Sequence, residues 1–536
     1  MAPPPRPSEW LIAGRYAVDT AQKLPGAAGN GLSAFAASDR SGTLDGLMAV
    51  QVQRTLPPRA DALAALTEPI DGVLSPLAHG PAPAPGGEGA YYIICPSPPG
   101  PSLEASAGRW TEDALLEQVL RPAARTLDRL ERCGVAHRAI RADNVFRDRS
   151  GRKVVLGCAW AAPPAAHQPP VYEPPYVAIC APAARGNGTI ADDVYALGVL
   201  LLTLAAGRSP LSGIDAAAVV ARKLELGSFA ALAGGERLPP IIADLLRGML
   251  AEDPDHRPSP ALLTEPAAAR ARRVAARPQR RAQRSLLIGE RAVWSTRTLA
   301  LALAAAPEAG LSALRAGWVD HWLRRSLGEA VLATRIEEAA RADAGDGSAG
   351  GALLLMVAIA RLDPLAPLCW QGLSLWPDGL GPALAAAPNA DTRERLVGLI
   401  ATEALGAWAA AREERCDALA MRMEGRRLKA WLDPRASPDG AQERLLYGLN
   451  PLLPCGSRLL DGAWAARLPD LLPALEAAAG RVDQRQSQPV DAQVAAFIGA
   501  RVERGPEGLA GFGGAQWNMA PIAELRVLAR LQAQFR

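Results

Sequence analysis

Lysine is scarce in this sequence. Its 58 basic residues include only four lysines, Lys23, Lys153, Lys223 and Lys429. Abundant Ala, Arg, Gly and Pro beside so few lysines are typical of a GC-rich, bacterial genome, so single prolines and arginines carry little weight as signals. The basic residues nearly balance 55 acidic ones, and the net charge therefore gives no reason to expect binding to nucleic acid or to a membrane surface.

The sequence also has no CxxC pair and no long apolar run. Its seven cysteines are odd in number and widely spread, which favours free thiols over a disulfide framework or a zinc site. No apolar stretch reaches the roughly 18 residues of a membrane span, and the start, MAPPPRPSEW, does not resemble a secretory signal. We therefore expect a cytoplasmic protein without a membrane span.

The pattern of apolar residues divides the chain. Short apolar runs alternate with turn-rich breaks over residues 15–94, which predicts strands joined by hairpins and one short helix at 60–67. A short strand is expected at 152–160. The remainder of this first half has helical patterns at 111–133, 191–206, 215–226 and 239–251.

An arginine-rich run separates this part from the second half. Residues 270–284 contain seven arginines and no acid. The Ala/Leu-rich sequence beyond it predicts mostly helices, without a convincing repeat. The expected division is a strand-rich lobe at 10–97, a helical lobe at 98–265, an Arg-rich linker at 266–285 and a helical domain at 286–536.

Three segments of the first half carry a family resemblance. They are GVAHRAIRADNVF at 134–146, ADDVYALGVLLLTLAAGRSPL at 191–211 and LLRGMLAEDPDHRPS at 245–259. In this order and at these distances they resemble the bacterial, eukaryotic-like serine/threonine protein kinases over residues 15–259. The resemblance implies an α+β fold, with a β-rich N-lobe and a helical C-lobe ahead of the helical domain.

The residues that a kinase needs are missing at the matching positions. Phosphoryl transfer by a kinase uses a strand lysine, an aspartate base and a metal-binding aspartate. The resemblance places Gln51 at the lysine, Ala139 at the base and Gly157 at the metal ligand. A lost base alone costs roughly 10²- to 10⁴-fold in rate, and the other two losses remove charge stabilisation. The sequence therefore predicts a degenerate member, a pseudokinase that acts as a scaffold or regulator.

The resemblance also marks positions for nucleotide binding. ATP stays a candidate ligand, whereas Mg²⁺ is not expected because a single amide oxygen makes a poor magnesium site. Backbone groups near Cys95 to Ser97 could contact adenine whatever the side chains are. The candidate positions are Gly29, Ala49, Cys95, Ser97 and Asn144.

Four other residues are expected to be structural. His137 and Arg138 should brace the core beneath their loop, and Asp193 should tie down backbone amides of that loop. Arg257 would pair with a carboxylate in the family, but Ala183 stands at that position, so another acceptor must satisfy Arg257 if it is buried.

Several segments leave a choice between two interpretations. APPAAHQPPVYEPPY at 162–176 is expected as a stiff surface loop, or else as a polyproline-type ligand anchored by Tyr172 and Tyr176. The arginine run favours a solvated linker over an acidic-partner or nucleic-acid site. GLSLWPDGLGP at 372–382 is a sensible place for a partner surface.

Two alternatives to a pseudokinase scaffold stay open. In the first, the chain is a kinase-fold enzyme with atypical chemistry, in which Lys23, the only lysine of the strand-rich lobe, replaces the missing one. In the second, the helical half is the functional unit and binds a partner. The expected partner is a protein rather than nucleic acid.

Overall fold

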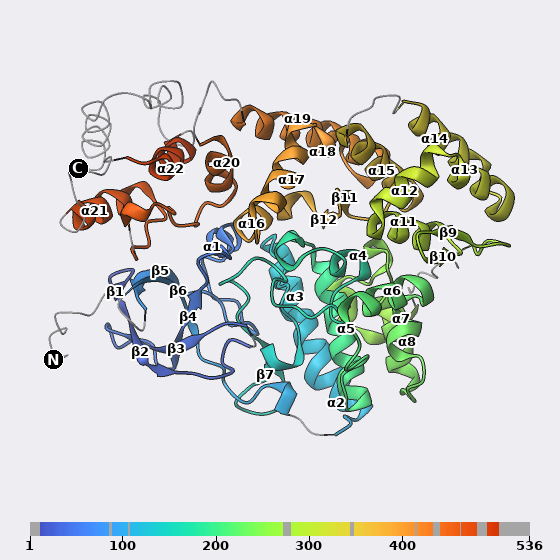
Figure 1. Cartoon of the computed structure of the whole chain (residues 1–536). Coiled ribbons are helices and arrows are strands. Elements are labelled where there is room, and N and C mark those ends of the chain that lie inside the picture. Colours follow the sequence, from blue (N-terminus) through green and yellow to red (C-terminus); the bar gives the residue numbers. More distant parts are fainter. Residues whose placement is uncertain are drawn as a thin grey trace.

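The computed structural model contains a sheet, a helical region behind it and a second, mostly helical half (Figure 1). No helix of the described part is both long enough and apolar enough to cross a membrane. All seven cysteines are free thiols. The structure describes residues 11–502 except 30, 85–87, 106–107, 272–279, 343–347, 413–414, 433–439, 461 and 480–489.

The first part of the chain forms an antiparallel sheet in the order β1-β2-β3-β4-β6-β5. The neighbouring strands β4 and β6 consist mostly of buried residues, as their near-continuous apolar sequences LMAVQV and YYIIC predict. A short helix, α1 (Ala60–Ala65), follows β4. The strands are β1 (Leu11–Ile12), β2 (Tyr16–Lys23), β3 (Ala34–Asp39), β4 (Leu47–Val52), β5 (Ala78–Pro83) and β6 (Gly89–Pro96).

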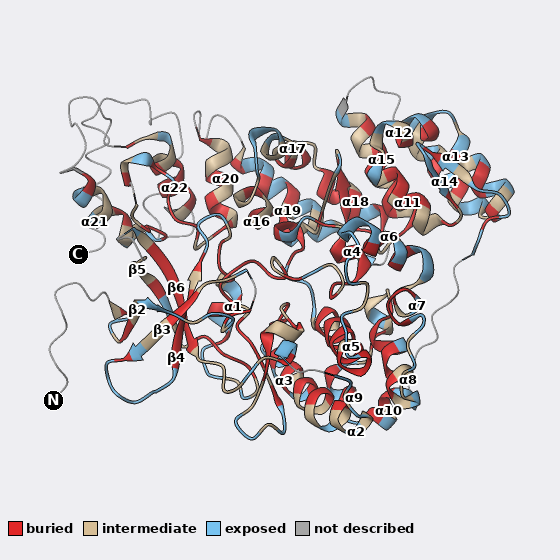
Figure 2. Cartoon of the chain, turned by 60° about the horizontal axis from the view of Figure 1, so that its bottom comes forward, coloured by how far each residue is buried: buried red, intermediate tan, exposed pale blue. Residues whose placement is uncertain are grey.

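The helical region packs around α5 (Ile190–Ala206), which Figure 2 shows as almost wholly buried. A capping box between Thr189 and Asp192 begins α5, and Gly207 ends it with a φ of +71°. Residues 112–132 are helical throughout, with Thr111 as the cap. The other elements are β7 (Val145–Arg147), β8 (Val154–Leu156), α4 (Pro175–Ala178), α6 (Ala216–Leu226), α7 (Ser228–Ala233), α8 (Pro240–Met249), α9 (Pro260–Leu263) and α10 (Pro266–Ala271), with 112–132 divided into α2 (Glu112–Ala114), a π-helical turn (Leu115–Leu120) and α3 (Arg121–Arg132).

The second half is helical apart from two small hairpins. These are β9 (Leu286–Ile288) with β10 (Arg291–Val293), and β11 (Leu368–Trp370) with β12 (Leu373–Leu375). The helices are α11 (Thr296–Ala305), α12 (Pro307–Arg315), α13 (Trp318–Trp322), α14 (Ala330–Ala342), α15 (Ser348–Leu362), α16 (Leu380–Ala385), α17 (Ala390–Ala401), α18 (Ala404–Ala411), α19 (Ala418–Trp431), α20 (Ala441–Leu449), α21 (Leu468–Ala479) and α22 (Ala492–Val502).

The second half lies along both parts of the first (Figure 1). Against the helical region, the backbone N–H of Trp376 donates to Ala184 O at 3.0 Å, and the hydroxyl of Tyr176 donates to Asp363 Oδ2 at 2.6 Å. The predicted partner surface at 372–382 is therefore part of a contact within the chain.

A second contact joins the far end of the helical half to the sheet. The backbone N–H of Gly89 donates to Gly462 O at 2.6 Å. The ring of Trp464 lies 5.7 Å from the ring of Tyr91, and the guanidinium of Arg54 lies 5.1 Å from the Trp464 ring. The helical half thus bridges the sheet and the helical region.

Two expectations from the sequence need correction. The linker expected at 266–285 is shorter, because its first residues form α10, which packs on α8 and α9, and Ala282 N donates to Trp294 O in the second half. The proline-rich run at 162–176 is not a surface loop or an accessible ligand, since Tyr172 and Tyr176 are each only 6% exposed. Its buried contacts are described below.

The bond between Tyr176 and Asp363 gives a test of the contact between the halves. Tyr176→Phe removes a donor from the buried Asp363 carboxylate and should lower the free energy of unfolding by about 1–3 kcal/mol. Tyr16→Phe is the matched control, because Tyr16 is 5% exposed but its hydroxyl has no hydrogen bond within the described residues. Urea denaturation measures both, and equal effects would contradict the prediction.

Candidate functional site

The loop at 134–146 leads from α3 to β7, which pairs with β8. This pairing carries the chain back beside the loop at Gly157, whose backbone N–H donates to Asn144 O at 2.8 Å. Gly157 therefore lies beside the end of the loop at 134–146.

A buried carboxylate holds the loop in place. Asp193, on α5, accepts hydrogen bonds from the backbone N–H groups of His137 and Arg138, each at 2.6 Å. Burial raises the pKa of Asp193 to about 7, while the Arg138 charge and the two amides oppose that rise. Arg138 has a φ of +62°, a conformation that a non-glycine residue keeps only when its surroundings impose it.

His137 joins this loop to residue 157. Its Nε2 lies 2.9 Å from Gly157 O, and its ring packs edge-on against Trp160. Burial lowers the pKa of His137 to about 3, so the imidazole is neutral at physiological pH. Nε2 must then carry the proton, because a carbonyl oxygen can only accept a hydrogen bond.

Neither Ala139 nor Gly157 supplies a carboxylate. Asn144 Nδ2 instead donates to Ala139 O at 3.0 Å and to Cys158 O at 3.1 Å, which joins the two segments through an amide. A Cβ atom built on Gly157 would lie 2.1 Å from Asn144 Oδ1. Asn144 thus occupies the space that a side chain at 157 would need.

The glycine-containing loop between β2 and β3 also lies against this region. A Cβ built on Gly29 would lie 2.6 Å from Arg141 Nη2 and 3.2 Å from Asn144 Oδ1. One built on Gly31 would lie 2.5 Å from His167 Nδ1. The backbone of this loop is therefore in direct contact with the residues beneath it.

The segment after β6 offers few backbone donors. Residues 96, 98 and 99 are prolines, which have no N–H. The remaining N–H, that of Ser97, donates to Gly46 O at 2.7 Å. Cys95 and Ala49 are both fully buried, and Cys95 Sγ lies 3.9 Å from Cys158 Sγ. Among the candidate nucleotide positions, Gly29 lies against Asn144, whereas Ala49 and Cys95 lie on the paired strands β4 and β6.

The strand and helix that would carry the kinase ion pair lack both of its members. Gln51 lies near the end of β4, and Asp61 and Glu68, the acids near α1, are exposed. Lys23 ends β2 and is exposed. Among the described residues, no group of three or more His, Cys, Asp or Glu side chains could share a metal ion.

Arg59 joins the loop at 134–146 to the segment at Ala159. It lies just before α1 and is 9% exposed. Its guanidinium donates to Ala136 O at 2.7 Å, to His137 O at 2.9 Å and to Ala159 O at 3.4 Å. Burial lowers the pKa of Arg59 to about 10, which still leaves it charged. Its position after two prolines gave no sign of this role in the sequence.

Arg138 and Lys223 fix the proline-rich segment at 162–176 through buried contacts. Arg138 Nη2 donates to Glu173 Oε2 at 2.8 Å, and both side chains are buried. Lys223, on α6, donates from Nζ to Pro170 O, Val171 O and Glu173 O at 2.8–2.9 Å. Burial lowers the pKa of Lys223 to about 7, with the Glu173 charge opposing. Two features of the sequence could have pointed to these roles. Lysine is scarce, and Glu173 is the only acid between residues 160 and 183.

Arg257 finds its acceptor in Asp192. Nη1 of Arg257 lies 3.0 Å from Asp192 Oδ1, and its other nitrogens donate to backbone carbonyls, including Ala251 O at 2.8 Å. Asp192 also caps α5 by accepting from Thr189 N. One carboxylate therefore replaces the acid that Ala183 lacks.

Comparisons with known proteins identify no family. No protein-family model and no curated protein match this chain. Among solved structures, the chain is similar to Rad53 (residues 1–466) in complex with AMP-PNP, with 16% identity and a TM-score of 0.37. The match covers 48% of this chain and 65% of that chain, a little under two thirds of it. What the chain does is therefore inferred from its own residues.

Acid should destabilise the protein through His137. The unfolded state binds the proton below the ordinary pKa of 6.5, whereas the folded state binds it only near pH 3. Lowering the pH from 7 to 5 should therefore reduce the free energy of unfolding by about 2 kcal/mol through this group. The His137→Phe variant should lose that part of the pH dependence in urea denaturation, while His79 and His167 contribute equally to both proteins. An unchanged pH dependence would refute the assignment.

Removing the Lys223 ammonium should loosen the proline-rich segment. Lys223→Met leaves three buried carbonyls without their donor, which should lower the free energy of unfolding by about 3 kcal/mol or more. Lys429→Met is the control, because Lys429 is 47% exposed and pairs with Glu403 on the surface, so its effect should stay below about 1 kcal/mol. Similar denaturation midpoints for the two variants would contradict the role of Lys223.

Proposed function

We propose that this chain is a pseudokinase, whose two-lobed, protein-kinase-like first half acts as a scaffold or regulatory module without phosphoryl transfer. One observation carries the proposal. The loop at Gly29 and the backbone at Gly157 both lie against Asn144, so the chain's own atoms fill the region where phosphates and metal would have to lie.

The arrangement of elements supports the kinase-like part of the proposal. A sheet precedes a helical region, and the strand with Gln51 is followed by α1. The loop at 134–146 is held on α5 by Asp193. These features agree with the β-rich and helical lobes that the sequence motifs imply.

The chemistry of the site supports the loss of activity. Phosphoryl transfer depends mainly on positioned charge around the phosphates. Gln51, Ala139 and Gly157 supply none of the required charges. The segment after β6 has no free N–H over residues 96–99 with which to bind adenine, because Ser97 N already donates to Gly46 O.

The pair between Arg138 and Glu173 supports a scaffold of constant shape. Kinase activation loops become ordered when an arginine pairs with a phosphorylated residue. Here a buried carboxylate of the chain itself pairs with the arginine, and Lys223 holds the same segment. The segment therefore keeps one shape without phosphorylation, as a scaffold requires.

The partner we propose is a protein. We place the interaction in the reducing cytoplasm, where seven free thiols would stay reduced. Residues 176–187 already contact the helical half. A protein substrate therefore cannot reach this stretch without displacing the helical half. We therefore expect a partner to bind on a surface that the contact between the two halves does not cover.

The decisive experiment is phosphoryl transfer by the purified full-length chain with labelled ATP and Mg²⁺. We expect no transfer to itself or to a generic acceptor protein, and no Mg²⁺-dependent thermal shift with ATP. The Gln51→Lys/Ala139→Asp/Gly157→Asp variant should stay inactive, because Asn144 blocks a side chain at 157. Transfer by the natural protein that disappears in Asn144→Ala would overturn the proposal.

The alternative enzyme needs Lys23. Lys23 is exposed at the end of β2, where little would hold its side chain near the loop at 134–146. If ATP binds the natural chain and Lys23→Met weakens that binding, the alternative is favoured. Unchanged behaviour of Lys23→Met removes it.

A further inference from the structure

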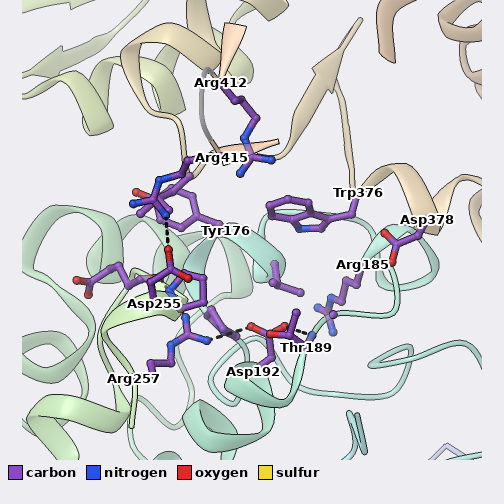
Figure 3. Close-up of a pocket in the computed structure, with 16 residues that line it drawn as sticks. Tyr176, Arg185, Thr189, Asp192, Asp255, Arg257, Trp376, Asp378, Arg412 and Arg415 are labelled. Atoms are coloured by element: carbon purple, nitrogen blue, oxygen red, sulfur yellow. Dashed lines mark hydrogen bonds and ion pairs between the residues drawn. The ribbon is translucent and has the colours of Figure 1, made fainter. Parts of the chain in front are cut away.

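A cavity of about 650 Å³ lies between the two halves (Figure 3). The first half contributes α4, residues 185–192 and residues 252–257. The second half contributes Leu365, Trp376, Arg412 and Arg415, among others. The volume lies within the range of about 300–1,000 Å³ that small-molecule sites occupy.

Most charges of the wall already have a partner. Arg257 pairs with Asp192 at 3.0 Å, and Arg415 pairs with Asp253 at 2.6 Å. Two acids of the wall are also engaged, because Asp378 accepts from Asn187 N at 2.7 Å and Glu252 accepts from Ser228 N. These charged side chains line the cavity, but each already has a partner within the protein and is therefore not open to pair with a ligand.

Arg412 is different, because it is a buried cation without an acid. It is 8% exposed, and its guanidinium has no carboxylate within ion-pair distance among the described residues. Nε donates to Pro364 O at 2.7 Å, and the guanidinium lies 4.4 Å from the Trp408 ring and 5.2 Å from the Trp376 ring. Burial lowers the pKa of Arg412. These contacts fix its orientation but leave both Nη atoms without an acceptor from the described part of the chain.

Two more donors of the cavity wall lack acceptors. Arg185 is 3% exposed and uses Nη1 for Ala165 O and Gln168 O, while its buried Nε has no acceptor among the described residues. The indole Nε1 of Trp376 is also buried without one. Figure 3 shows Arg412 and Arg185 on opposite sides of the Trp376 indole. Because these two nitrogens have almost no accessible surface, they lie behind the wall of the cavity, and the donors open to it are the Nη atoms of Arg412.

We propose that this cavity binds a small organic anion, with a carboxylate or phosphate group at Arg412 and a planar apolar body beside Trp376, Tyr176 and Leu365. A stacked guanidinium presents a rigid fork that matches either oxyanion in two hydrogen bonds. The aromatic and aliphatic side chains supply the apolar contact.

Binding at this place would couple the two halves of the protein. The wall includes Tyr176, which bonds to Asp363, and Trp376, which bonds to Ala184. A ligand that binds the docked arrangement stabilises it by mass action. The site does not depend on whether the first half transfers phosphate, so the kinase assay and the binding assay can fail separately.

The test is titration calorimetry of the full-length chain with phenyl phosphate, benzoate and inorganic phosphate. We expect saturable binding of phenyl phosphate or benzoate, and at least tenfold weaker binding by Arg412→Gln. Arg412→Lys should also bind more weakly, because a lysine lacks the fork. Arg427→Gln is the matched control and should bind as the natural chain does, because Arg427 also stacks on a tryptophan, Trp431, but is exposed and pairs with Glu424.

Three results would overturn the proposal. They are no saturable binding of either organic anion, equal affinity in Arg412→Gln, and inorganic phosphate binding as tightly as phenyl phosphate, which would exclude the apolar subsite. If Arg412→Gln does not fold, Leu365→Trp provides the second test, because it fills the cavity while keeping both arginines. Undiminished binding by Leu365→Trp would likewise refute this location.

Discussion

The buried carboxylate of Asp193 is the contact on which the first half depends. By accepting the amides of His137 and Arg138, it fixes a loop that contains a left-handed residue. From that loop, His137 reaches Gly157 and Arg138 reaches Glu173. One carboxylate therefore fixes the loop at 134–146, and the loop in turn fixes residues 157 and 173.

Cationic side chains join neighbouring segments of the first half. Arg59 and Lys223 donate to backbone carbonyls, and Arg257 pairs with Asp192. Each of these cations is buried and hydrogen-bonded to the protein, which is what a buried charge requires. These charges therefore stabilise one conformation of the first half.

The helical half completes this arrangement by covering part of the first. It contacts the sheet near Tyr91 and the segment around Ala184, so movement of one lobe against the other would break contacts at both ends. The cavity at Arg412 lies within the second of these contacts. Arg412 has a hydrogen bond to Pro364 O and two tryptophan faces but no carboxylate partner among the described residues, and a bound anion would supply one.

Local sequence determined most strands and helices of the first half, because their positions follow from the spacing of apolar residues. It also determined that Gln51, Ala139 and Gly157 carry no charge. Local patterns could not reveal the roles of Arg59, Lys223, Glu173 and Arg412, or that the proline-rich run is buried. Those roles depend on pairs as far apart as 187 positions, as between Tyr176 and Asp363. Only tertiary packing decides which distant carbonyl, carboxylate or ring meets a given cation.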